Sequence, residues 1–92
     1  MNIVNLTPTA LTSGAGATTS MAHELATRQS GVVQVDGIND ETVQIQGRLE
    51  GSMGWVTLST FTADGVADIT LFPQMRANMS AGTGSITARI GA

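Results

Sequence analysis

The stretch Val43-Gln44-Ile45-Gln46-Gly47-Arg48-Leu49 places apolar residues or glycine on one parity and polar residues on the other. Two later segments, Met75-Arg76-Ala77-Asn78-Met79-Ser80 and Ser85-Ile86-Thr87-Ala88-Arg89-Ile90, alternate in the same way. A period of two is typical of strands that bury one side and expose the other to water. Several such segments close together predict a small antiparallel β domain.

Further strands are predicted around these three segments, separated by glycine, proline and Asp-Gly. The predicted strands are 2–6, 32–36, 42–49, 55–61, 67–72, 74–80 and 85–90. The segments 63–65 and 81–84 are predicted to close hairpins, and the glycines of 50–54 to take positive φ in a tight connection. Strands at intervals of about ten residues suit an antiparallel β-sandwich or a jelly roll. The predicted class is therefore all-β, with at most one short helix.

The first thirty residues differ from the rest. Residues 1–30 are predicted to form an extended N-terminal arm, and residues 31–92 the β-sandwich domain. The run 12–20 consists of small and polar residues, which bury too little surface to offset the entropy lost on ordering. The run 21–28 fits a short helix and a strand equally well.

Length and composition limit the classes of protein that fit. A domain of 92 residues buries only roughly 60–65% of its unfolded surface, so subunit contacts are expected to add stability. The chain has no cysteine, so no disulfide can supply it. It also has no lysine and only four scattered arginines, which is not the basic patch that nucleic acid requires. No segment has the apolar length of a membrane span or the pattern of a secretion signal, so assembly in a cytoplasm is expected.

No set of residues predicts an enzyme or a cofactor. His23 is the only histidine, and it lies in a stretch without a fixed partner for acid–base chemistry. The loop residues Asp36, Asn39, Asp40 and Glu41 are rich in oxygen, but their spacing is not that of a calcium loop, and a solvated turn fits better. Gly82-Thr83-Gly84 lacks the lysine and the helix of a phosphate loop, which leaves a turn.

Trp55 is the only tryptophan, and it opens a strand directly after a glycine turn. A side chain of this size is expected to cover one end of the core or to stand at a subunit contact, with stacking on a sugar as the alternative. The five methionines fit irregular gaps or an adaptable interface.

In their order along the chain, these pieces resemble a pattern found in small virion proteins of tailed bacteriophages. In that pattern a strand and a glycine turn lead into Trp-Val-Thr-Leu and Ala-Asp-Gly. A strand ending near proline, an arginine and a closing Ala-Gly-Thr-Gly follow. The matching segments here are 43–51, 55–58, 63–65, Pro73 with Arg76, and 81–84. The turn before the tryptophan departs from the pattern, because Glu50-Gly51 and Met53-Gly54 stand where Asp-Gly and Asn are common.

The resemblance implies a structural protein of the phage particle, with a β-sandwich or jelly-roll fold. The resemblance favours a head decoration, or cement, protein that is a homotrimer and bridges subunits of the major capsid protein. A neck, collar or fibre component is the first alternative. A carbohydrate-binding module that uses Trp55 is the second. None of these roles implies a cofactor, a metal, a nucleic acid or a membrane.

The expected interface has two parts. The arm presents a short β segment that can pair with an unpaired strand edge of a partner. The β domain contributes the large ring of Trp55, the flexible side chain of Met75 and the positive charge of Arg76. The residues expected at the interface are Ile3, Val4 and Leu6 in the arm, and Trp55, Met75 and Arg76 in the domain.

Overall fold

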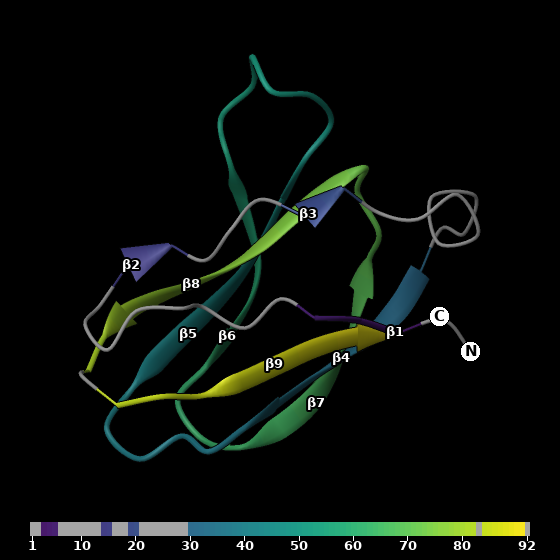
Figure 1. The fold of residues 1–92 in the computed structure, drawn as a ribbon. Coiled ribbons are helices and arrows are strands. Elements are labelled where there is room, and N and C mark those ends of the chain that lie inside the picture. Colours follow the sequence, from purple (N-terminus) through teal and green to yellow (C-terminus); the bar gives the residue numbers. More distant parts are fainter. Residues whose placement is uncertain (1–2, 6–13, 16–18, 21–29, 83, 92) are drawn as a thin grey trace.

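The computed structural model describes residues 3–5, 14–15, 19–20, 30–82 and 84–91, which form two antiparallel sheets packed face to face (Figure 1). Sheet A has the order β1 (Ile3–Asn5), β9 (Thr87–Gly91), β4 (Ser30–Asp36), β7 (Gly65–Thr70). Sheet B places β5 (Thr42–Arg48) between β8 (Gln74–Ala81) and β6 (Val56–Phe61). The short strands β2 (Gly14–Ala15) and β3 (Thr19–Ser20) pair with the outer edge of β8. The prediction of an all-β antiparallel sandwich is confirmed.

The strand bounds follow the alternation in the sequence. Each of the seven predicted strands has a counterpart whose ends are shifted by at most two residues. The predicted run 21–28 lies outside the described residues, and so does most of the run 12–20.

The core lies between the sheets and is built from every second residue of the long strands. Side chains on one parity of β5 and β8 point inward and meet the inward parity of β4 and β9. The buried apolar residues are Val33, Val35, Val43, Ile45, Phe61, Ile69, Met75, Ala77, Met79, Ile86, Ala88 and Ile90. Two methionines of β8 thus fill the gap between the sheets, as flexible unbranched side chains do.

Most connections carry the chain from one sheet to the other. Only β5 and β6 form a hairpin among the six long strands, because β4–β5, β6–β7, β7–β8 and β8–β9 each cross between sheets. The predicted hairpins at 63–65 and 81–84 are therefore wrong. Glycine and aspartate mark a change of direction, and the same residues serve a turn within a sheet and a corner between sheets.

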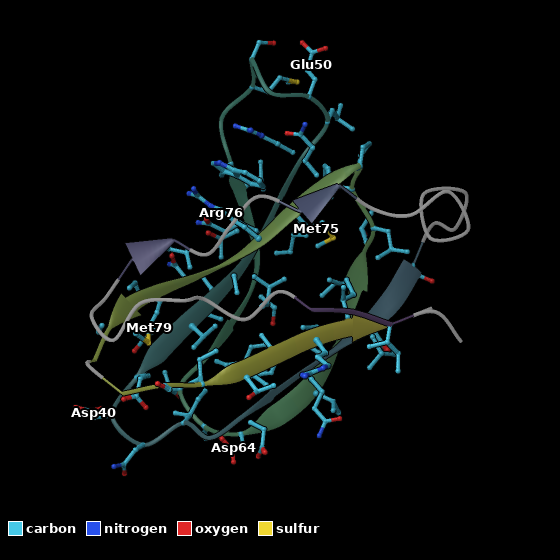
Figure 2. All side chains as sticks on the ribbon, viewed as in Figure 1. Asp40, Glu50, Asp64, Met75, Arg76 and Met79 are labelled. Atoms are coloured by element: carbon cyan, nitrogen blue, oxygen red, sulfur yellow. The ribbon has the colours of Figure 1, made fainter. Side chains whose placement is uncertain are left out.

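Three of these crossings meet at one end of the sandwich, and their described residues are 37–41, 62–64, 82 and 84–86. The labelled Asp40 and Asp64 lie at this end, whereas Glu50 in the β5–β6 hairpin lies at the other (Figure 2). The positive φ values among the described residues also occur here, at Gly37 and Gly82, and not in the hairpin at 50–54 as predicted. We call this region the crossover end.

Glu41 ties the crossover end together. Its side chain is buried, and its two carboxylate oxygens accept hydrogen bonds from the backbone N–H groups of Asn39 (2.8 Å) and Gly84 (2.9 Å). Gly82 packs so closely on Glu41 that a Cβ atom at Gly82 would lie 2.7 Å from the Cα atom of Glu41. Position 82 therefore requires glycine for two reasons: Glu41 occupies the space that a side chain would need, and the backbone φ is 96°.

Replacing Gly82 with alanine should therefore destabilise the fold. The new Cβ meets backbone, which cannot yield as a flexible side chain can, and a positive φ is strained for alanine. We expect Gly82→Ala to lower the free energy of unfolding by roughly 1–3 kcal/mol. Gly54→Ala is the control, because a Cβ atom there meets nothing within 4 Å, and it should change stability by less than about 0.5 kcal/mol. Urea unfolding of the two variants measures both values. Equal stability would contradict the role given to Gly82.

Candidate functional site

The outer face of sheet B carries a row of paired polar side chains. Residues directly opposite each other on β5 and β8 are joined side chain to side chain, in three successive pairs. Arg48 Nε donates to Gln74 Oε1 (2.7 Å), Arg76 Nε to Gln46 Oε1 (2.7 Å), and Asn78 Nδ2 to Gln44 Oε1 (3.0 Å). Gln46 Nε2 donates onward to Thr57 Oγ1 on β6 (3.2 Å). One line of hydrogen bonds therefore crosses all three long strands of the sheet.

Trp55 lies on this same face, and its ring contacts two arginines. The guanidinium carbon of Arg48 is 4.2 Å from the centroid of the Trp55 ring, and that of Arg76 is 4.4 Å from it. Both distances are well inside the range of cation–π attraction, which is strongest for tryptophan. Figure 2 shows Arg76 on β8 at this side of the sandwich. We call Arg48, Trp55 and Arg76 the Arg–Trp–Arg cluster.

The geometry of sheet B explains how the cluster forms. Val56 pairs with Gly47, so Trp55 enters β6 beside Arg48 on the neighbouring strand. Gln46 faces Arg76 and Arg48 faces Gln74, so the two arginines are diagonal neighbours on adjacent strands. A bulge, at which Leu58 lies between residues paired with Ile45 and Gln46, adjusts β6 just beyond the tryptophan.

The cluster carries positive charge on an acidic chain. Neither guanidinium has a carboxylate partner among the residues that the structure describes; the Nε–H of each is bound by a neutral glutamine. Partial burial, and then the charge of Arg48, lower the pKa of Arg76 from its ordinary value. The cluster therefore offers positive charge to an anionic or polar surface, and no ion pair between described residues has to break first.

The predicted interface residues divide between several places. Trp55 and Arg76, as just described, lie together on the outer face of sheet B. Met75 is wrong as a surface residue, because it is fully buried between the sheets. The alternation along β8 explains this burial, because Met75 points to the same side of the strand as the inward-facing Ala77 and Met79.

One arm segment pairs within its own chain, and pairing of the arm with a partner stays a prediction. Ile3, Val4 and Asn5 pair with β9 of the same chain, and the side chain of Ile3 is largely exposed on sheet A. Leu6 lies outside the described residues, as does His23. The described arm segments thus cover one edge of each sheet, β9 in sheet A and β8 in sheet B.

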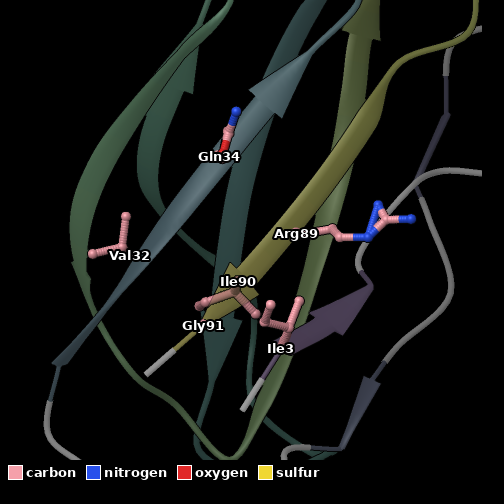
Figure 3. Close-up of a pocket in the computed structure, with 6 residues that line it drawn as sticks. All are labelled: Ile3, Val32, Gln34, Arg89, Ile90 and Gly91. Atoms are coloured by element: carbon pink, nitrogen blue, oxygen red, sulfur yellow. The ribbon is translucent and has the colours of Figure 1, made fainter. Parts of the chain in front are cut away.

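The outer face of sheet A has a shallow hollow next to the polar side chains of Asp36 and Thr87. It is lined by Ile3, Val32, Gln34, Arg89, Ile90 and Gly91 and has a volume of about 240 Å³ (Figure 3). Gly91 pairs with Ile3 on one side and Val32 on the other, so the missing side chain leaves space between two exposed apolar residues. Arg89, the remaining described arginine, lines this hollow. It belongs to β9 of sheet A, whereas Trp55 precedes β6 of sheet B.

The oxygen-rich loop serves the fold. Glu41 binds backbone amides as described above, and Asp64 Oδ1 accepts the backbone N–H of Ile38 at 2.7 Å. Hydrogen bonds from the backbone N–H groups of Ile38 and Gly37 lower the pKa of Asp64. No group of three or more histidine, cysteine or acidic residues suited to a metal ion occurs within the described part of the chain.

In comparisons with known proteins, no protein-family model, no curated protein and no solved structure matches the chain. Within the described ranges, no helix has the length and apolar character needed to cross a membrane. The candidate site therefore depends on its geometry alone, and this geometry singles out the Arg–Trp–Arg cluster. Arg48 and the glutamines that orient the arginines were not predicted, although Gln46 and Arg48 share the outward parity of β5.

The Glu41 carboxylate should make stability depend on pH. A hydrogen bond from Asp40 and those from the amides of Asn39 and Gly84 lower the pKa of Glu41 from 4.5 to about 2. A carboxylate whose pKa is lower in the folded state contributes stability above the unfolded pKa, and this contribution is lost as pH falls from 4.5 to about 2. Asp40 acts in the opposite sense, because its hydrogen bond and charge interaction with Glu41 raise its own pKa.

We expect Glu41→Gln to be less stable than the natural chain at pH 7. Between pH 4.5 and 2, the stability of the variant should fall less than that of the natural chain, because the variant lacks the carboxyl group that titrates in this range. Glu50→Gln removes the same charge at the hairpin end and serves as the control. Thermal unfolding followed by circular dichroism across this pH range measures the difference. Parallel pH profiles for Glu41→Gln and the natural chain would show that Glu41 does not supply the dependence.

Proposed function

We propose that this chain is a structural protein of a tailed-bacteriophage virion, a capsid decoration protein that stabilises the head by bridging neighbouring shell subunits. The observation that carries the proposal is the Arg–Trp–Arg cluster on the outer face of sheet B. Tryptophan and arginine are the residues most enriched at the centres of protein interfaces. Here both arginines are held on a regular sheet face by hydrogen bonds to neighbouring glutamines, and the Trp55 ring contacts both guanidinium groups.

The face is ready to bind without rearrangement. Arg48 and Arg76 are each fixed at two points, by a glutamine oxygen at Nε and by the Trp55 ring under the guanidinium group. Side chains that are already ordered lose less entropy on binding, which strengthens association. A decoration protein that attaches to a preassembled shell needs a rigid docking surface of this kind.

The small core supports the same reading. The described apolar core consists of twelve residues between two sheets, and a domain of this length buries only roughly 60–65% of its unfolded surface. Contacts with other subunits would add to that burial. The proposal therefore includes a homotrimer that is assembled in the host cytoplasm and becomes part of the virion, with the major capsid protein as its partner. The resemblance to small phage virion proteins supplies this identity of the partner.

Among the alternatives, the observed geometry favours none over decoration of the head. A neck, collar or fibre component would use the same surface on another part of the particle. A carbohydrate-binding module would stack a sugar on Trp55, but two guanidinium groups already lie over that ring. A sugar would have to displace a cation that the ring attracts.

Removal of the tryptophan should weaken attachment to heads. We expect Trp55→Ala to bind empty heads from the same source at least tenfold more weakly, because both arginines lose their support. Val66→Ala, which shortens an exposed side chain on sheet A, is the control and should bind as the natural chain does. Co-sedimentation with heads measures binding, and circular dichroism verifies that each variant is folded. Equal binding of Trp55→Ala would place the docking surface elsewhere. No binding of the natural chain to heads would refute the proposed function.

The oligomeric state can be measured on the free protein. We expect sedimentation equilibrium at micromolar concentration to give three times the 9.4 kDa mass of one chain. The physical reason is the limited core, which leaves exposed apolar side chains such as Ile3, Val56 and Val66 on the surface of one chain. A stable species of 9.4 kDa would contradict the trimer.

A further inference from the structure

The Arg–Trp–Arg cluster concentrates the positive charge of an acidic chain. The chain has four arginines, no lysine and a formal net charge of −3. Two of those arginines meet at one ring, with guanidinium carbons 4.2 and 4.4 Å from its centroid. Like charges repel, so this arrangement has an electrostatic cost that an anion placed beside the cluster would remove.

The arginines are oriented without being neutralised. Each forms its described hydrogen bond through Nε to the amide oxygen of a glutamine, Gln74 for Arg48 and Gln46 for Arg76. A guanidinium group has five N–H donors, and those of the two terminal nitrogens form the fork that binds a carboxylate through two parallel bonds. Between described residues, no hydrogen bond joins these terminal nitrogens to a carboxylate.

The electrostatic environment agrees with this geometry. Burial, and then the charge of Arg48, lower the pKa of Arg76, so the charged form of this guanidinium is less favoured here than in water. An incoming carboxylate would reverse that effect, because an opposite charge favours the charged form of the arginine. The attraction between the two charges strengthens when the partner surface excludes water, and this offsets the cost of removing both groups from water.

We propose that the Arg–Trp–Arg cluster is a receptor for carboxylate groups, and that its partner presents aspartate or glutamate side chains at the contact. This inference rests on the proposed docking through sheet B and names the chemistry of the partner's surface. Carboxylates fit better than a nucleic acid, because a polyphosphate requires many cations and this chain, with its net charge of −3, would repel it beyond the cluster.

The single tryptophan makes the site observable. Trp55 is the only tryptophan of the chain, so its fluorescence reports on the cluster directly. Titration with hexaglutamate at low salt should give a saturable change in that fluorescence, and added salt should weaken it because screening acts on exposed charges. Inorganic phosphate and double-stranded DNA, tested in the same way, should bind more weakly than hexaglutamate. Tighter binding of either would overturn the assignment to carboxylates.

Variants separate the cluster from the overall charge. The double variant Arg48→Gln with Arg76→Gln should bind hexaglutamate at least tenfold more weakly. Arg89→Gln makes the same change on sheet A, so its binding should stay within twofold of the natural chain. Arg76→Lys keeps the charge but loses the fork, and an intermediate affinity is expected. If the double variant unfolds, Arg76→Lys and Arg48→Gln alone are compared with Arg89→Gln. Equal losses in cluster and control variants would overturn the proposal.

Heads provide the second measurement and separate the two proposals. If the double variant binds heads as well as the natural chain while Trp55→Ala does not, docking through this face stands and the carboxylate receptor is wrong. If hexaglutamate binds through the cluster and heads do not bind at all, the receptor stands and the decoration function is wrong.

Discussion

The buried carboxylate of Glu41 is the interaction on which the arrangement of the two sheets depends. Consecutive strands of this chain mostly lie in different sheets, so the corners must be held in place for the inward faces to meet. Glu41 holds two of the corners through the amides of Asn39 and Gly84, and Asp64 adds the third through the amide of Ile38. A carboxylate accepts such charge-assisted bonds well, which offsets the cost of its burial. The glycines at 82 and 84 leave the space that this carboxylate needs.

With the corners fixed, the two outer faces become separate surfaces with different character. Sheet B presents a hydrogen-bonded polar row that ends in the Arg–Trp–Arg cluster. Sheet A presents a shallow hollow between Ile3 and Val32, two apolar side chains separated by Gly91. The described arm segments pair with one edge of each sheet, which leaves β6 and β7 as the opposite edges among the described strands. Unpaired edges are places where another chain can add a strand, so a sandwich of this design has room for contacts beyond the cluster.

Most of the fold could be predicted from the sequence, because the burial of a strand residue is encoded by its parity. The alternation of 43–49 and 74–80 gave the strands and their inward faces, and it also contained the evidence that Met75 is a core residue. Pairing between strands could not be predicted in the same way. The segments 63–65 and 81–84 contain residues that suit any sharp change of direction, and the sheet that the chain enters next is decided by packing of residues far apart in sequence.

The candidate site was predictable only in part, for the same physical reason. Trp55 and Arg76 stand out by residue type, but their contact requires β6 and β8 to flank β5. Arg48 joins them because the register places it opposite Gln74 and beside the entry to β6. Glutamines 46 and 74 have no distinctive signal in the sequence, since an isolated glutamine in a strand usually faces water. Their role follows only once the register is known.

The choice of glutamine at these two positions gives the cluster its character. A glutamate in place of Gln46 or Gln74 would orient the arginine equally well, but it would also neutralise the charge. An amide oxygen accepts the Nε–H and leaves the positive charge intact. The Trp55 ring acts in the same sense, because it attracts a cation through its quadrupole without cancelling the charge. On a chain with a net charge of −3, side chains that fix two arginines and preserve their charge are what a surface specific for an acidic partner requires.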